Sequence, residues 1–175
     1  MSKSINIFGF HSLESLLKSN PERVLKVFIQ TGRSDKRILS ILDDLLIQRI
    51  SFSKIDKNKL DLLAKGESHQ GIIAEIILPP LPGETILIES IKNSSKKPLM
   101  LILDSIQDPR NLGACLRSAN AAGVDYVVIN KDGSAPINSL VHKASAGAIN
   151  SIKIFQVTNL VRTIKAIQKE GLWVI

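Results

Sequence analysis

Apolar residues recur along the first half of the chain in two alternating patterns. Short apolar runs rich in β-branched residues predict strands at 24–30, 51–55 and 71–78. Between the runs, leucine and isoleucine at helical spacing predict helices at 11–18, 35–46 and 56–63. Candidate caps for these helices are Ser12, Ser34 or Asp35, and Asp56. Strands that alternate with helices predict an α/β domain over residues 1–78.

A stretch rich in proline then interrupts the pattern. Three prolines and a glycine within residues 79–83 exclude a helix or a central strand there. A short helix can follow at 84–92 before the chain turns polar again. We therefore predict a linker over 79–97, with one domain before it and a second domain over 98–175.

The second domain repeats the alternation of strands and helices. Apolar runs predict strands at 99–103, 126–129, 152–157 and 172–175. Helical spacing predicts helices at 112–122, 137–148 and 160–170, the last capped by Asn159. Unbroken apolar strands of this kind are typical of a parallel sheet covered on both faces. A sheet of four strands with a short last one is small, so we expect this domain to be incomplete.

Charge and cysteine content narrow the functional classes. The 175 residues contain 23 basic and 16 acidic side chains, a net charge of +7, which favours an anionic partner such as a nucleic acid. A surface charge that serves only to keep the protein soluble would explain the net charge of +7 equally well. A single cysteine excludes an internal disulfide and fits a reducing cytoplasm. The histidines are scattered and no long apolar segment is present, so we expect neither a metal site nor a membrane span.

Candidate chemistry is concentrated where the strand at 99–103 ends. In parallel sheets ligands bind beyond the carboxyl ends of the strands, and the loop 104–111 lies at such an end. Asn111 occupies the place of a helix N-cap, and capping alone would explain an asparagine at this position. The backbone N–H groups of Leu112 and Gly113 in the same turn are candidates to receive a phosphate.

Arg117 is the one charge on a helix of otherwise small and apolar residues, which we expect to be mostly buried. A buried charge is costly unless it is paired. A salt bridge to Asp104 or Asp108 satisfies that requirement, and so does a bidentate contact with an RNA phosphate. The residues alone leave both explanations open.

Several motifs resemble one family of enzymes. The stretch LDSIQDPRNLGACLRSANAAGVDYVVI, residues 103–129, is similar to the first signature motif of the SpoU/TrmH branch of the SPOUT RNA methyltransferases. The segments IFGFHSLESLL (7–17), GRSDKRI (32–38) and HQGI (69–72) resemble the substrate-binding domain of that branch. The likeness extends over the whole chain.

The resemblance implies both a fold and an activity. The fold is a small N-terminal α/β RNA-binding domain, similar to a ribosomal-protein fold, followed by a SPOUT domain with a Rossmann-like parallel sheet. The activity is methyl transfer from S-adenosylmethionine to a ribose 2'-hydroxyl, with guanosine in 23S rRNA as the acceptor and a homodimer as the working form. The second and third motifs of the family, which form the trefoil knot and bind the cofactor, have no counterpart here. We therefore expect a truncated chain that binds S-adenosylmethionine poorly, with no cofactor residue that can be assigned.

The resemblance also implies roles for individual residues. Asn111 and Arg117 match the catalytic positions of the first motif, where the arginine takes part in activating the 2'-hydroxyl. A guanidinium is a poor base in water. We therefore expect Arg117 to orient a phosphate and stabilise the developing alkoxide. Candidate RNA contacts are Arg110, Arg33, Lys36 and Arg37, although a solvated helix start also explains the last three.

Two alternative interpretations of the sequence, neither of which involves catalysis, stay open. One is an RNA-binding module made of the first domain and half of a SPOUT domain. The other is a remnant of a disrupted methyltransferase gene.

Overall fold

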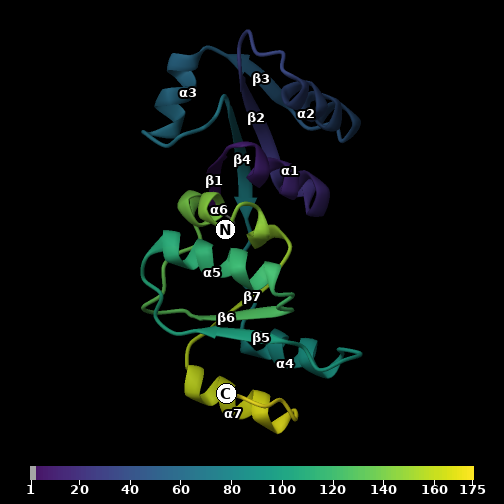
Figure 1. Cartoon of the computed structure of the whole chain (residues 1–175), viewed down its shortest axis with the longest axis vertical. Coiled ribbons are helices and arrows are strands. Elements are labelled where there is room, and N and C mark those ends of the chain that lie inside the picture. Colours follow the sequence, from purple (N-terminus) through teal and green to yellow (C-terminus); the bar gives the residue numbers. More distant parts are fainter. Residues whose placement is uncertain (1–2) are drawn as a thin grey trace.

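The computed structural model describes residues 3–175, which form two lobes, each built around its own sheet (Figure 1). Within this range no helix combines the length and hydropathy that a membrane crossing requires. The same residues contain no group of three or more His, Cys, Asp or Glu side chains placed to hold a metal ion.

The first lobe has a mixed four-stranded sheet in the order β1–β4–β2–β3. Its strands are β1 (Lys3–Phe8), β2 (Val24–Gln30), β3 (Phe52–Ile55) and β4 (Ile72–Leu78). Strand β4 runs antiparallel to β1 and β2, whereas β2 and β3 are parallel. The three predicted strands are confirmed, and the apolar opening of the chain supplies β1.

Helices cover both faces of this sheet. They are α1 (Phe10–Ser19), α2 (Lys36–Ile47) and α3 (Lys57–Ala64), with a 3₁₀ turn η1 (Pro21–Arg23). Helices α1 and α2 pack on one face and α3 on the other. Asp35 and Asp56 cap α2 and α3 as predicted. Ser12 does not cap α1, which begins directly after Gly9; its hydroxyl instead donates to the carbonyl oxygen of His142 in the second lobe, at 3.2 Å.

The second lobe is a parallel sheet between two layers of helices, as the sequence predicted. Its strands, in the spatial order β5–β6–β7, are β5 (Met100–Leu103), β6 (Tyr126–Asn130) and β7 (Lys153–Val157). Its helices are α4 (Glu84–Lys92), α5 (Pro109–Ala121), α6 (Ser139–Ala144) and α7 (Leu160–Lys169). Helices α5 and α6 cover one face, and α4 and α7 cover the other. Leu87 and Ile91 of α4 are buried against the sheet, so this helix within the predicted linker is part of the packing of the second lobe.

Two predicted elements of this lobe are wrong. The predicted helix at 137–148 is split into α6 and a 3₁₀ turn η2 (Ala148–Asn150). Ala146 (φ 49°) and Gly147 (φ 93°) adopt left-handed conformations that end the α-helix. Residues 172–175 form no strand, and Trp173 is 92% exposed. A strand needs a neighbour for its backbone groups, and no strand of residues 3–175 pairs with this segment.

The start of α5 also differs from the prediction. Asp108, rather than Asn111, is the N-cap: its carboxylate accepts from the backbone N–H of Arg110 at 2.6 Å and of Asn111 at 3.3 Å. Pro109 takes the first helical position, where a missing N–H has no cost. The helix therefore begins three residues before Leu112, and Asn111 lies exposed within its first turn.

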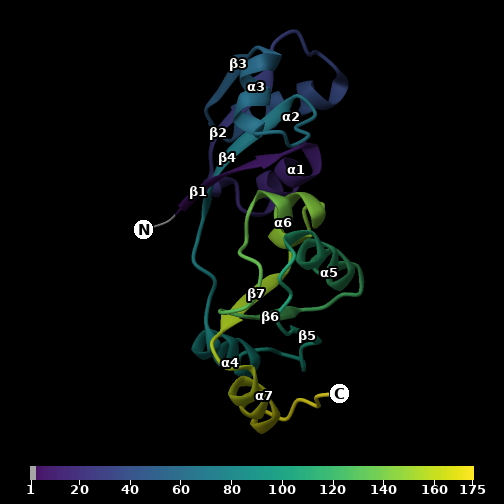
Figure 2. The same cartoon turned by 90° about the vertical axis from the view of Figure 1, so that its left-hand side faces the viewer.

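Helix α6 and turn η2 join the two lobes (Figure 2). The hydroxyl of Ser15 in α1 donates to the carbonyl oxygen of Gly147 at 2.9 Å, and Lys143 pairs with Glu67 at 2.8 Å. A Cβ on Gly147 would lie 2.7 Å from the Cβ of Ser15. The lobes therefore approach so closely at Gly147 that no space is left there for a side chain.

The opposite side of α6 carries α5. A Cβ on Gly113 of α5 would lie 2.5 Å from the Cβ of Ala144 and 2.9 Å from the carbonyl oxygen of Val141. Such distances are shorter than real carbon contacts, so only glycine permits this approach. Helix α6 is therefore held between the first lobe and α5.

One buried histidine lies at this junction. His142 has no exposed surface, and neither of its ring nitrogens has a hydrogen-bond partner within residues 3–175. Burial lowers the pKa of His142 to about 4, and the charge of Arg23 adds to the effect. The imidazole is therefore neutral at physiological pH.

The cap of α5 leads to a first prediction. Asp108→Ala should lower the free energy of unfolding by about 1 kcal/mol, the usual effect of removing an N-cap. Asn111→Ala is the matched control and should change it by less than about 0.5 kcal/mol, because the exposed amide caps nothing. Urea denaturation followed by circular dichroism measures both values. Equal losses at the two positions would contradict the assignment of the cap.

The buried histidine leads to a second prediction. Because the pKa of His142 is near 4 in the folded protein and about 6.5 when unfolded, the unfolded state binds the extra proton between these values. Stability conferred by the neutral ring is therefore lost as the pH falls from about 6.5 to about 4, by up to roughly 3 kcal/mol. His142→Leu removes this dependence and keeps the contributions of all carboxylates. Denaturation at several pH values should show wild type losing stability relative to the variant toward acid; parallel curves would refute the prediction.

Candidate nucleic-acid interface and catalytic edge

Helix α5 is buried on one side only. Leu112, Leu116 and Ala119 face the sheet and α6, whereas the other side is exposed. The expectation that Arg117 lies on a mostly buried helix is therefore wrong. Its side chain is exposed, and within residues 3–175 it makes no ion pair with Asp104, Asp108 or any other acid. This side of α5 is exposed because the first lobe packs on α6 and does not reach it.

The exposed side of α5 presents two arginines. Arg110 and Arg117 are seven positions apart, so they project from the same side of the helix about two turns from one another. Asn111 precedes Arg117 by six positions, which is about 9 Å along the axis and about 120° around it. Ala114 lies between the arginines and is exposed. All three predicted residues of α5 are therefore exposed, but only Arg110 and Arg117 share a side of the helix, and Asn111 lies about 120° away from Arg117.

The first turn of α5 offers no free cradle for a ligand. The N–H groups of Arg110 and Asn111 donate to the carboxylate of Asp108, and the N–H of Leu112 donates to its carbonyl oxygen at 3.0 Å. Gly113 faces α6 rather than a ligand. The expected phosphate site at Leu112 and Gly113 is therefore not formed. Because these N–H groups are already bonded, the first turn of α5 does not fit S-adenosylmethionine either.

The loop before α5 is fixed by contacts that sequence reasoning missed. Ser105 has a left-handed conformation (φ 54°), and its N–H donates to the side-chain oxygen of Asn130 at 3.1 Å. The N–H of Ala135 donates to the carbonyl oxygen of Ile106 at 2.7 Å. These bonds tie the loop after β5 to the end of β6. No local pattern identifies Asn130, because asparagine at the end of a strand is compatible with any turn.

The predicted RNA contacts of the first lobe fall into two groups. Arg33 donates twice to Asp35, at 3.0 and 2.6 Å, and Arg37 donates twice to Glu14, at 2.7 and 2.8 Å. The hydrogen bonds from Arg37 hold the pKa of Glu14 below its usual range. Lys36 is exposed and has no ion-pair partner within residues 3–175. Of the three cations, only Lys36 therefore carries a charge that the chain leaves unneutralised.

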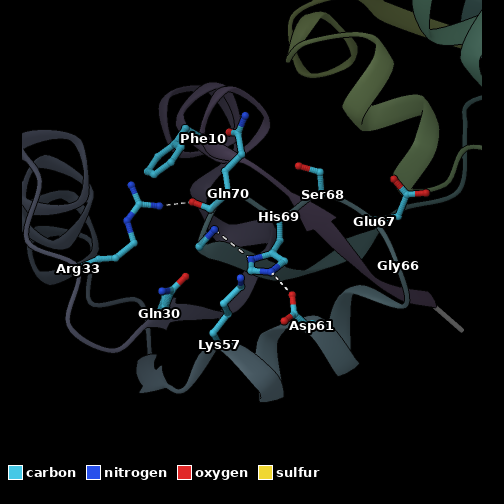
Figure 3. A pocket seen from close by; sticks show the side chains of 11 residues that line it. Phe10, Gln30, Arg33, Lys57, Asp61, Gly66, Glu67, Ser68, His69 and Gln70 are labelled. Carbon is cyan, nitrogen blue, oxygen red and sulfur yellow. Dashed lines mark hydrogen bonds and ion pairs between the residues drawn. The ribbon is translucent and has the colours of Figure 1, made fainter.

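Arg33 and Arg37 share a further contact. Their guanidinium carbons lie 5.4 and 4.6 Å from the centre of the buried Phe10 ring. Arg33 also donates to the backbone oxygen of Gln70 and lines a cavity of about 730 Å³, shown in Figure 3. The positions of both arginines are therefore fixed by the fold. Sequence reasoning missed the cavity because its walls come from segments far apart in the chain.

Comparison with family models identifies both parts of the chain. Residues 98–175 match the SpoU rRNA Methylase family, and residues 6–82 match the model described as RNA 2'-O ribose methyltransferase substrate binding. These matches include the two motif regions whose resemblance was noted from the sequence.

Curated relatives match along the whole chain. The 23S rRNA (guanosine-2'-O-)-methyltransferase RlmB of Haemophilus ducreyi is 43% identical over 173 residues, which is 98% of this chain and 70% of that protein. RlmB of Pseudomonas aeruginosa is 41% identical over 175 residues, 100% of this chain and 70% of that protein. The chain thus spans about 70% of the length of these relatives.

Solved structures share the fold at low sequence identity. The SpoU methyltransferase AviRb from Streptomyces viridochromogenes, in complex with the cofactor AdoMet, is 14% identical with a TM-score of 0.72. An RNA 2'-O ribose methyltransferase is 20% identical with the same TM-score of 0.72. The matches cover 96% and 97% of this chain but 59% and 60% of those chains. The predicted fold class is confirmed, and the chain belongs to the SpoU family of rRNA methylases.

Proposed function

We propose that the protein that contains this chain methylates the ribose 2'-hydroxyl of a guanosine in 23S rRNA, with S-adenosylmethionine as the methyl donor. The observation that carries this proposal is the match to RlmB methyltransferases at about 40% identity over the whole chain. The first lobe binds the RNA, in agreement with the description of its family model. The second lobe carries the catalytic residues Asn111 and Arg117.

Arg117 is suited to act on the substrate because nothing in the described chain neutralises it. An exposed guanidinium without an ion pair is available for a bidentate contact with an RNA phosphate. Because arginine stays protonated, Arg117 orients the ribose and stabilises the negative charge that develops on its oxygen, but it does not accept the proton. Asn111, whose amide is not used as a cap, is free to donate to and accept from the same nucleotide. Arg110 extends the cationic surface.

Partners and location follow from the same assignment. The substrate is 23S rRNA, so the protein acts in the cytoplasm where ribosomes are assembled. We also propose a homodimer. The exposed C-terminal end of α5 supports this, because Ala121 and Ala122 leave space there for a second copy, beyond the arginines that contact RNA.

The activity is tested in cells that lack their own guanosine 2'-O-methyltransferase for 23S rRNA. Expression of the protein that contains this chain should restore 2'-O-methylguanosine in 23S rRNA, as measured by mass spectrometry of nuclease digests. Binding to 23S rRNA without restoration would contradict the activity and support an RNA-binding module instead.

The role of Arg117 is tested in the same system. Arg117→Ala should reduce methyl transfer by about 100-fold or more, because a charge that stabilises the reacting oxygen is lost. Affinity for 23S rRNA should fall by less than about tenfold, since many phosphate contacts remain. Lys165→Ala on α7, an exposed cation on the far face of the sheet, is the matched control and should leave both unchanged. Full transfer by Arg117→Ala would remove this residue from the mechanism.

A further inference from the structure

The cavity of the first lobe lies where three loops converge, at the starts of α1 and α2 and before β4 (Figure 3). Its volume of about 730 Å³ is within the range of sites that take small organic groups, about 300–1,000 Å³. Lys57 reaches it from α3, and Arg33 faces it from the opposite wall.

His69 fixes the loop that forms the floor of the cavity. His69 is 7% exposed, and its Nδ1 accepts from the backbone N–H of Gly71 at 3.0 Å. Its Nε2 therefore carries the hydrogen and donates to Asp61 at 2.9 Å. This loop passes through left-handed conformations at Gln70 (φ 54°) and Gly71 (φ 81°). The walls are thus held by hydrogen bonds rather than left to adjust on binding.

Arg33 forms a flat wall in a fixed position. One side of its guanidinium lies over the Phe10 ring, and Asp35 and the backbone of Gln70 hold its edges. A Cβ on Gly71 would lie 2.8 Å from the Cδ of Arg33, so the glycine lets the arginine lie against the loop. A planar guanidinium whose charge is already paired offers a surface for stacking more than a charge for phosphate.

Two other polar side chains line the cavity without partners. Within residues 3–175 neither Gln30 nor Lys57 makes a side-chain hydrogen bond or an ion pair. The amide of Gln70 points away from Gln30, toward Gly9 (Figure 3). The amide of Gln30 can both donate and accept, as the edge of a nucleobase requires. Asp61 and Glu67 also line the cavity, and their carboxylates disfavour a free phosphate deep inside it.

We propose that this cavity binds one unpaired nucleotide of the RNA substrate. The base stacks on Arg33, the amide of Gln30 bonds its edge, and Lys57 contacts the adjacent phosphate. A base in a duplex has its edge already paired and cannot enter, so the cavity selects RNA with an extruded or single-stranded nucleotide. The inference rests on the proposed function, because it assigns a site within the lobe that binds the RNA.

The test uses the full chain and two RNA hairpins of equal length. One carries a single unpaired 2-aminopurine, and the other is fully paired. Wild type should bind the first about tenfold more tightly, the size expected for one stacked and bonded base, and should quench its fluorescence. Gln30→Ala and Lys57→Gln should lose most of this preference. Lys59→Gln, on the same helix but paired with Asp56 and outside the cavity, is the matched control and should keep it.

The outcomes separate this inference from the proposed function. Equal affinity of wild type for the two hairpins, or an unchanged preference in the folded Gln30→Ala and Lys57→Gln variants, would overturn the cavity assignment while 23S rRNA binding stands. Failure of the chain to bind 23S rRNA at all would contradict the proposed function and the inference together. Thermal denaturation of each variant shows that it is folded.

Discussion

Close packing on the two sides of α6 is the constraint on which the arrangement of this molecule depends. Gly147 lets the turn after α6 approach α1, and Gly113 lets α5 approach α6. Protein interiors tolerate no overlap, so each glycine fixes the separation of the elements it joins. The orientation of the first lobe relative to α5 follows from these contacts. These contacts therefore also fix the distance between the first lobe and Asn111 and Arg117.

The arginines of this chain fall into two sets, those that an acidic side chain neutralises and those that have no such partner within residues 3–175. In the first lobe the fold neutralises Arg33 and Arg37 with Asp35 and Glu14, and it stacks both on one aromatic ring. These two arginines therefore contribute fixed, flat surfaces rather than free positive charge. On α5 the described chain provides no acid for the arginines, so their charges stay available to a polyanion. A net charge of +7 therefore says little about RNA binding until the pairs are known.

Local signals predicted most elements correctly, and their failures have a common cause. Asp35, Asp56 and Asn159 cap helices as expected, because a cap bonds backbone groups within three residues. Asn111 and Asp108 are both suitable cap residues three positions apart, and spacing could not decide between them. The helix predicted at 137–148 was broken by a left-handed Ala146, a conformation that alanine rarely adopts and that the contact of η2 with α1 imposes.

The sequence by itself determined the alternation of strands and helices, the parallel sheet of the second lobe and, through its motifs, the family. Those properties depend on contacts between residues close in the chain or on residues that match a known pattern. Only the tertiary structure decided which side of α5 is exposed, which arginines are paired and that three distant loops line one open cavity. Each of these depends on contacts between segments tens of residues apart. The spacing of residues along the chain predicts local structure but does not predict such contacts.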